Sequence, residues 1–592
     1  MSETNDPGLY FAEDGQPRSE RFGDIYYSLE DGLSETRAVF LKGCHMPDIW
    51  AERRRFVVGE LGFGTGLNIC ALMALWAEHR PRDGYLHIFS VEGFLMQAHE
   101  ARQALSAWPE LAEYVDALLA QWPFNRRGFH HMSFPQWGVS FTLALMEVRD
   151  ALDGWDGKAD AWFLDGFSPA LNPDMWAEDV LQRIGAHTAV GGRVATFTVA
   201  GSVRRGLEAA GFAPRKVPGF GKKREQLEAI YTAEANGVFE NVMPQRVAII
   251  GAGIAGVSVV RALAEKGIDA DLFDAHGLGG GASGNRAGLM TPRLDAGGGT
   301  ISQLFADGFY YAYGLYNRLC PEAIISQGVQ QIPSGPRDSG RFQKIAQQAG
   351  FAADDMSADA NGLLMHKALA IEPLRVLEAL KGPQAVVTDR IVRMERQEDG
   401  WRLYGEGGTY DGYDQIFITC GDGLFDLKAI LADELDLRPV RGQIEVAQSS
   451  QRSSQAAAWG GYYVPVPEGF VFGSTHIRGD RGAEVRVEDR TRNLETLSQA
   501  RTDEAASVVS EELHSRASIR MTTRDHLPVM GEVENGVFVL TGLGARGFCL
   551  GPLLGQALVA QALGFPSPLS HSMQAILSHK RFLPALSEVA IA

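Results

Sequence analysis

Short apolar segments that lead through glycines into helix-like stretches recur along the chain. The clearest begins at residues 247–250, an apolar run typical of a buried strand, and continues through Gly251, Gly253 and Gly256. Residues 257–263 then carry apolar side chains at helical spacing. A strand, a glycine turn and a helix in this order are typical of the first nucleotide-binding unit of an α/β fold.

Each glycine of this turn has a separate expected role. Gly251 permits the tight turn, Gly253 lets the backbone approach a pyrophosphate, and Gly256 allows the helix to pack closely on the strand. Asp274 ends the next apolar strand, at the distance where a carboxylate binds ribose hydroxyls. Such a motif alone is often only a strand–helix turn, and alone it fits NAD as well as FAD. The agreement of strand, helix and acidic residue favours a dinucleotide site.

A second strand–glycine–helix unit, of another kind, lies near the N-terminus. An apolar strand is predicted at residues 55–61 and a helix at residues 69–76. The compressed turn between them suits a loop that wraps an adenosyl group better than one that seats a pyrophosphate. The residues expected around that group are Glu60, Gly62, Gly64, Gly66 and Asn68.

Two further predicted strands in this half end in carboxylates. Residues 86–91 are followed by Glu92, which can bind two ribose hydroxyls, and residues 161–164 are followed by Asp165. Ligands of open α/β sheets lie beyond the carboxyl ends of the strands, so we expect both carboxylates in one site. The structural alternative is a plain α/β domain with glycine turns.

Together these motifs resemble the class I S-adenosylmethionine-dependent methyltransferases. The most specific part is the run from Asp165 to Pro169, where amino-group methyltransferases carry a short acidic loop that holds the target nitrogen. The resemblance implies S-adenosyl-L-methionine as methyl donor and Asp165 as the group that orients the amine and accepts a proton. Asp165 as a cap of the following loop is the alternative. Phe167 and Trp176 could stack an extruded base, although core packing suits them equally well.

The C-terminal half contains a second strand, glycine loop and helix, far along the chain from its first nucleotide-binding unit. Residues 279–288 form a glycine-rich loop, and near the C-terminus a predicted strand at residues 537–540 precedes another glycine loop and a helix. This pattern resembles the FAD-dependent D-amino acid oxidase and glycine oxidase superfamily from residue 246 to the C-terminus. The late loop favours FAD over NAD. Beyond the first motif, the resemblance implies FAD contacts from Ser283, Asn285, Val392, Gly542, Gly544, Arg546 and Gly547.

The same resemblance implies an arginine for the substrate carboxylate. Arg520 stands in the segment before the late flavin loop, and a guanidinium fork pairs bidentately with a carboxylate. Arg546 is a second candidate. A salt bridge elsewhere is the alternative for Arg520 and also for Arg524. Because the flavin accepts hydride from the carbon beside a neutral amine, we name no catalytic base.

The sequence therefore predicts an α/β protein with a Rossmann-like class I methyltransferase domain followed by a Rossmann-like FAD-binding domain that carries an antiparallel-sheet substrate subdomain. The predicted boundaries are residues 1–233 for the methyltransferase, 234–245 for a linker and 246–592 for the oxidoreductase. Within the latter, residues 246–300, 370–425 and 515–592 are assigned to FAD binding, and residues 301–369 and 426–514 to the substrate subdomain.

The composition of the chain limits the class of protein and the compartment that we expect. The chain has 592 residues, 45% of them hydrophobic, which is ordinary for globular protein. The five cysteines are scattered and the histidines have no ligand spacing, so we expect reduced thiols and no metal. The N-terminus is polar and no apolar run reaches membrane-spanning length, so we expect a cytoplasmic monomer with no membrane contact.

The formal net charge of -18 argues against nonspecific coating of nucleic acid but leaves room for a local basic patch. The candidates all lie in the first half: Arg53–Arg55, Arg126–Arg127, Arg204–Arg205 and Lys222–Arg224.

The order of the two halves resembles the family of bifunctional tRNA 5-methylaminomethyl-2-thiouridine biosynthesis enzymes over nearly the whole chain. The resemblance implies tRNA as partner, with the flavin half removing the carboxymethyl group from the wobble 5-carboxymethylaminomethyluridine and the other half methylating the resulting amine. Two alternatives remain. One is a small-molecule glycine or sarcosine oxidase fused to an N-methyltransferase, and the other is a flavin or S-adenosylmethionine sensor without catalysis.

Overall fold

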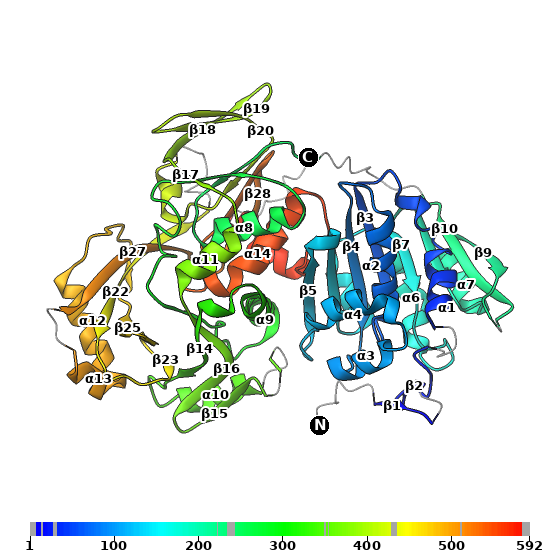
Figure 1. Cartoon of the computed structure of the whole chain (residues 1–592), viewed down its shortest axis with the longest axis horizontal. Coiled ribbons are helices and arrows are strands. Elements are labelled where there is room, and N and C mark those ends of the chain that lie inside the picture. Colours follow the sequence, from blue (N-terminus) through cyan, green and yellow to red (C-terminus); the bar gives the residue numbers. More distant parts are fainter. Residues whose placement is uncertain are drawn as a thin grey trace, which may run out of the picture. The chain divides into compact units, whose positions relative to one another are not determined.

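The computed structural model describes residues 8–13, 16–27, 32–221, 223–233, 243–347, 351–352, 354–427, 435–508 and 512–582. The chain forms two compact units (Figure 1). The first contains Met1–Asn241 with Glu265–Gly267 and Gly564–His571, and the second contains Val242–Ala264, Ile268–Leu563 and Ser572–Ala592. Residues 234–242 of the predicted linker lie outside the described residues, so the linker stays a prediction.

The described part of the first unit is built on an eight-stranded sheet in the order β5-β6-β4-β3-β7-β8-β10-β9. The five central strands run parallel, whereas β5, β10 and β9 pair antiparallel with their neighbours. The strands are β3 (Arg55–Leu61), β4 (Tyr85–Glu92), β5 (Gly128–Phe134), β6 (Val139–Leu145), β7 (Ala159–Leu164), β8 (Thr188–Thr196), β9 (Phe212–Pro218) and β10 (Glu225–Tyr231). A separate hairpin joins β1 (Leu9–Phe11) to β2 (Pro17–Ser19).

Both faces of this sheet are covered, which explains why its central strands are apolar without alternation. In β3, Phe56 and Val58 belong to one core, while Val57 and Leu61 belong to the other. The helices are α1 (Gly32–Thr36), α2 (Leu67–His79), α3 (Ala98–Leu105), α4 (Ala112–Leu119), α5 (Val148–Gly154), α6 (Glu178–Ala186) and α7 (Gly201–Ala209).

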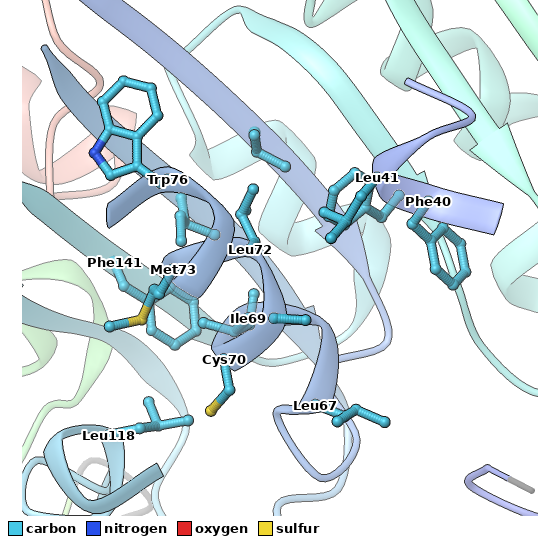
Figure 2. Packing of buried hydrophobic residues seen from close by; sticks show 14 of the residues in the cluster. Phe40, Leu41, Leu67, Ile69, Cys70, Leu72, Met73, Trp76, Leu118 and Phe141 are labelled. Carbon is cyan, nitrogen blue, oxygen red and sulfur yellow. The ribbon is translucent and has the colours of Figure 1, made fainter. Parts of the chain in front are cut away.

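Helix α2 is the centre of the larger core. Its Ile69, Leu72, Met73 and Trp76 are fully buried, and Figure 2 shows them among side chains from other elements, including Phe141 of β6. This burial fixes the start of α2, and with it the glycine turn that precedes the helix. The predicted helix at residues 69–76 is confirmed and extends further at both ends, from Leu67 to His79.

The second unit contains the predicted dinucleotide-binding sheet. Its described strands lie in the order β17-β12-β11-β21-β29-β28, parallel except for the hairpin of β28 and β29. They are β11 (Val247–Ile250), β12 (Asp271–Asp274), β17 (Val386–Thr388), β21 (Gln415–Ile418), β28 (Val529–Glu534) and β29 (Val537–Thr541).

Helices α8 (Ile254–Ala264) and α14 (Gly547–Ala562) lie side by side in this unit (Figure 1). Glycines make the close approach possible, because a Cβ at Gly555 would lie 2.7 Å from the carbonyl carbon of Ser258, and one at Gly547 would lie 2.8 Å from Cγ2 of Ile254. The first and last glycine motifs of the unit therefore meet, as the sequence predicts.

A larger, mainly antiparallel sheet forms the predicted substrate subdomain. Its described strands are β13 (Gly288–Met290), β14 (Ile324–Gln331), β15 (Met356–Asp359), β16 (Gly362–Ile371), β22 (Leu437–Gln448), β23 (Ala456–Ala458), β24 (Tyr462–Val466), β25 (Gly469–Gly473), β26 (Ile477–Arg478) and β27 (His514–Thr523). β13 and all but the first residue of β27 fall outside the ranges predicted for the subdomain. β13 pairs with β16 and β27 pairs with β22, so residues assigned to FAD binding belong to this sheet.

The remaining described elements surround the two sheets. A small antiparallel sheet of β18 (Ile391–Gln397), β19 (Gly400–Gly405) and β20 (Thr409–Tyr413) was missed by the sequence prediction. The helices are α9 (Gly299–Leu319), α10 (Asp338–Ala346), α11 (Pro373–Lys381), α12 (Val487–Ala500), α13 (Thr502–Ala506) and α15 (His571–Leu577). All five cysteines are free thiols. Within the described ranges, no helix is both long and apolar enough to cross a bilayer.

Candidate active sites

A cavity of about 600 Å³ opens at the carboxyl ends of the parallel strands in the first unit. It lies where the predicted motifs meet: the glycine loop after β3, Glu92 at the end of β4 and Asp165 after β7 all line it. In the loop, Gly62 and Gly64 have φ values of 88° and 54°, which side chains other than glycine rarely adopt. A Cβ at Gly62 would also lie 2.3 Å from the carbonyl oxygen of Asp165.

Glu92 is held by backbone donors. The N–H groups of Gly64 and Phe94 donate to its two carboxylate oxygens at 3.0 and 2.8 Å. Burial raises the pKa of Glu92, and these hydrogen bonds oppose the rise. A carboxylate has about four lone-pair sites, so two remain for a diol such as a ribose. The geometry fits the expected adenosyl group.

Asp165 lines the same cavity and is held by a chain of two hydrogen bonds. Asn68 Nδ2 donates to its Oδ2 at 2.9 Å, and Thr36 Oγ1 in turn donates to Asn68 Oδ1 at 2.8 Å. Removal from bulk water raises the pKa of Asp165 to about 6, with Glu35 adding to the rise and the Asn68 hydrogen bond opposing it. The group is therefore ionised at neutral pH and close enough to its pKa to exchange a proton.

The wall beside Asp165 is aromatic. Phe167 lies 4.7 Å from Phe22 and 5.3 Å from Tyr26 between ring centroids, and all three rings line the cavity. Phe22 and Tyr26 were missed by the sequence analysis, because nothing near them in the sequence resembles a motif. Lys223 also lines the cavity. Its Nζ lies 2.7 Å from Glu35 Oε1 and 4.3 Å from the ring centroid of Phe197.

Three predicted residues of this half do not line the cavity. Glu60 is fully buried, its Oε2 accepts a hydrogen bond from Ser90 at 2.5 Å, and burial raises its pKa to about 8. Gly66, with φ 84°, caps the start of α2. Trp176 is 7% exposed and belongs to the core, where its indole donates to the Phe167 carbonyl at 2.9 Å. Trp176 therefore supports the loop from behind, which corrects the expected stacking role.

In the second unit a cavity of about 850 Å³ surrounds the predicted dinucleotide motif. A Cβ at Gly256 would lie 1.8 Å from the carbonyl oxygen of Gly251, so the turn cannot form with any other residue there. Asp274 Oδ2 accepts the Ala252 N–H at 2.8 Å, and Ser283 Oγ accepts the Ile254 N–H at 3.0 Å. Gly253, which lines the cavity without a side chain, and these fixed polar groups fit a dinucleotide pyrophosphate and ribose.

The cavity continues along the predicted flavin residues. Asn285 lines it and accepts a hydrogen bond from Arg516 Nη1 at 2.8 Å. From the late loop, Gly542, Gly544, Arg546 and Gly547 line it as well. Val392 does not, and the neighbouring Asp389, Arg390 and Ile391 take its place. The expected contact of Val392 with the cofactor stays a prediction.

Arg520 reaches the same cavity from β27 in the larger sheet. Its Nη2 donates to the Thr475 carbonyl at 3.0 Å, and within the described residues it has no ion pair with a carboxylate. Removal from bulk water lowers the pKa of Arg520 to about 10, and Arg546 adds to this effect. The guanidinium thus stays charged at neutral pH and fits a carboxylate ligand. Arg524 instead is exposed and lies 3.2 Å from Asp436, outside the cavity.

Comparison with known proteins adds the family. Residues 109–232 match the S-adenosyl-L-methionine-dependent methyltransferase family, and residues 246–561 match the FAD dependent oxidoreductase family. Over 614 aligned residues, the chain is 44% identical to the tRNA 5-methylaminomethyl-2-thiouridine biosynthesis bifunctional protein MnmC of Caulobacter sp. (strain K31), with all of both chains covered. The chain belongs to the MnmC family. The MnmC of Caulobacter vibrioides is 46% identical, with 98% of each chain covered.

The MnmC family assignment confirms the predicted fold class, the two enzyme types and the two cofactors. Glycine oxidase from Geobacillus kaustophilus superposes on this chain with a TM-score of 0.50 at 18% identity, covering 57% of this chain and 99% of its own, and this likeness shows the fold alone. Among the described residues, no group of three or more His, Cys, Asp and Glu side chains could hold a metal ion.

In three of the basic clusters predicted for RNA contact, one residue is paired with a carboxylate. Arg53 lies 2.8 Å from Asp160, and Arg204 lies 2.6 Å from Glu208. Arg126 is 2% exposed. Lys222 lies outside the described residues. The RNA footprint in the first unit stays a prediction.

Proposed function

We propose that this chain performs two consecutive steps on the wobble uridine of tRNA. The second unit would remove the carboxymethyl group from 5-carboxymethylaminomethyl-(2-thio)uridine, and the first unit would methylate the aminomethyl group that remains. The observation that carries the proposal is 44–46% identity, over essentially the full length of the chain, to proteins named for tRNA 5-methylaminomethyl-2-thiouridine biosynthesis. The chain also has both the methyltransferase cavity and the flavin cavity that the two steps need.

In the first step, FAD supplies the hydride acceptor when bound. Arg520 would bind the substrate carboxylate and so place the carbon between carboxylate and amine within the cavity. Loss of a hydride from that carbon and a proton from nitrogen leaves a C=N bond. Water then adds to this carbon, the C–N bond breaks, and a two-carbon oxo acid departs from the primary amine. Arg520 needs no proton transfer in this role.

In the second step, the amine lone pair attacks the sulfonium methyl group of S-adenosylmethionine. Asp165 would accept the hydrogen bond of the neutral amine and take its proton as the N–C bond forms. Phe167, beside Phe22 and Tyr26, offers a ring face for an extruded base. Glu92 would hold the ribose of the methyl donor.

The test uses tRNA from cells that lack this protein. Purified holoprotein should bleach its flavin anaerobically with that tRNA, and mass analysis of the nucleosides should find the aminomethyl form, followed by the methylaminomethyl form once S-adenosylmethionine is added. Free glycine and sarcosine are the comparison. Bleaching by these and not by tRNA would make the chain a small-molecule oxidase instead. No bleaching by either would favour a sensor.

A further inference from the structure

A second hollow of about 580 Å³ adjoins the flavin cavity in the second unit. The two share Gln331, Trp459 and Arg546 as lining residues. The other residues around the second hollow are Arg293, Leu294, Asp295, Ala296, Gly297 and Arg341. The role of Arg520 and the expected contacts of FAD use none of the residues that belong to this hollow alone.

Cations dominate this hollow, since three guanidinium groups and one carboxylate line it. Arg293 Nη1 is buried and has no hydrogen-bond partner within the described residues. Arg546 Nη1 donates to Thr291 Oγ1 at 3.0 Å, and Arg341 Nη2 donates to the Leu294 carbonyl at 2.7 Å. Arg341 Nη1 also lies 3.6 Å from Asp338 Oδ1, so its charge is partly balanced, whereas no carboxylate pairs with Arg293 or Arg546 in the part of the chain that the structure describes. Burial lowers the pKa of Arg546, and the positive charge of Arg293 lowers it further. Like charges gathered in this way are stabilised by an anion that bridges them.

A phosphodiester fits this arrangement better than a second small carboxylate. Its two unesterified oxygens accept hydrogen bonds from guanidinium forks, and it is attached to a sugar and base that can fill the rest of the space. Trp459 supplies an aromatic side chain at the border of the two cavities, and its indole is fixed by a hydrogen bond to the Thr496 carbonyl at 3.1 Å. Bases stack on aromatic rings whatever their sequence.

We propose that Arg293, Arg341 and Arg546 bind a backbone phosphate of the RNA substrate while the carboxymethylamino arm of its nucleotide enters the flavin cavity. This inference rests on the proposed function. It assigns RNA contacts to the oxidoreductase unit, where the sequence analysis placed none. It also separates two anion sites: Arg520 holds the carboxylate of the arm, and the three-arginine pocket holds the phosphate.

The test compares three substrates on full-length holoprotein: hypomodified tRNA, the free 5-carboxymethylaminomethyl nucleoside and its 5′-monophosphate. The variants are Arg341→Ala and Arg293→Ala. Lys344→Ala is the matched control, because this exposed cation lies on the same helix as Arg341 but does not line the pocket. Anaerobic flavin reduction gives KM and the limiting rate separately, and the flavin content of each variant checks its fold.

Each arginine variant should raise the KM for tRNA about tenfold, the size of one charge-assisted hydrogen bond, with a nearly unchanged limiting rate. The slope of log affinity against log salt concentration should become less negative by about 0.7, the value of one lost phosphate contact. The nucleoside should react equally with all variants. A raised KM for the monophosphate as well would assign the pocket to the nucleotide's own phosphate, and an unchanged one would assign it to a neighbouring phosphate.

Two results would overturn the proposal. One is an unchanged KM for tRNA in both arginine variants. The other is an equal loss for tRNA and the nucleoside, because that pattern reports damage to the flavin site. A wild-type protein that ignores hypomodified tRNA would reject the proposed function itself, and the pocket assignment with it.

Discussion

The hydrogen bond from Asn68 to Asp165 should set the pH at which methyl transfer begins. Asn68 Nδ2 donates to Asp165 Oδ2 at 2.9 Å and so favours the carboxylate form. A hydrogen bond to a charged group contributes about 1.5–3 kcal/mol, and one pKa unit corresponds to about 1.4 kcal/mol. Asn68→Ala should therefore raise the pKa of Asp165 by about one unit from its value of about 6, or somewhat more where water does not replace the amide.

The assay is single-turnover methyl transfer to aminomethyl tRNA between pH 5 and 9. Asp165 must be ionised to accept the amine proton, so the rate should rise with pH through its pKa. In Asn68→Ala this rise should begin about one pH unit higher, and the two enzymes should converge at high pH. The titration of the substrate amine is common to both and leaves their difference unaffected.

Thr36→Val is the matched control. It removes the hydrogen bond from Thr36 Oγ1 to Asn68 Oδ1 but leaves the Asn68–Asp165 contact in place. Its profile should stay within half a pH unit of the wild type. If Asn68→Ala keeps its affinity for S-adenosylmethionine and also keeps the wild-type profile, Asp165 is not the proton acceptor.

Three further predictions concern stability and cofactor retention. Burial raises the pKa of Glu60 to about 8, above its value in the unfolded chain, so the wild type should lose stability as pH rises from about 4.5 to 8. In Glu60→Gln, urea midpoints measured across this range should fall less steeply with pH. An equal dependence on pH in both proteins would contradict the assignment. Gly256→Ala places a Cβ 1.8 Å from a backbone carbonyl oxygen of the turn and should yield protein without flavin absorbance. Gly340→Ala in α10, with nothing within 4 Å of the added carbon, should stay yellow, and equal flavin content in both would rule out the steric argument. Asp489→Ala leaves the fully buried Arg441 without its ion-pair partner, so the free energy of unfolding of the second unit in urea should fall by about 3–5 kcal/mol. A fall below about 1 kcal/mol would mean that water reaches the site.

The sequence predicted the parts of each site that depend on local backbone geometry. Gly62 and Gly251 follow apolar strands, and Gly256 lies in the first turn of α8. All three permit conformations or contacts that a side chain forbids, so their roles can be read from spacing alone. Asp165 and Glu92 were found because ligands bind where parallel strands end. These inferences need only one strand, one turn and one helix.

Residues positioned by distant parts of the chain were harder to assign. Trp176 follows the acidic loop directly, yet its ring turns into the core, and no sequence signal separates that outcome from stacking on a base. Arg293 and Arg341 reach one pocket from separate elements, and neither belongs to a motif.

The flavin-binding sheet joins the two ends of the second unit, since β21 pairs with β11 on one side and with β29 on the other. During translation the first glycine turn leaves the ribosome long before α14 exists to cover α8. Flavin uptake would therefore wait for the closing helix, and until then the face of α8 that packs on α14 stays uncovered in the nascent unit. A chain interrupted before residue 547 would be expected to be degraded without ever becoming a partial oxidoreductase.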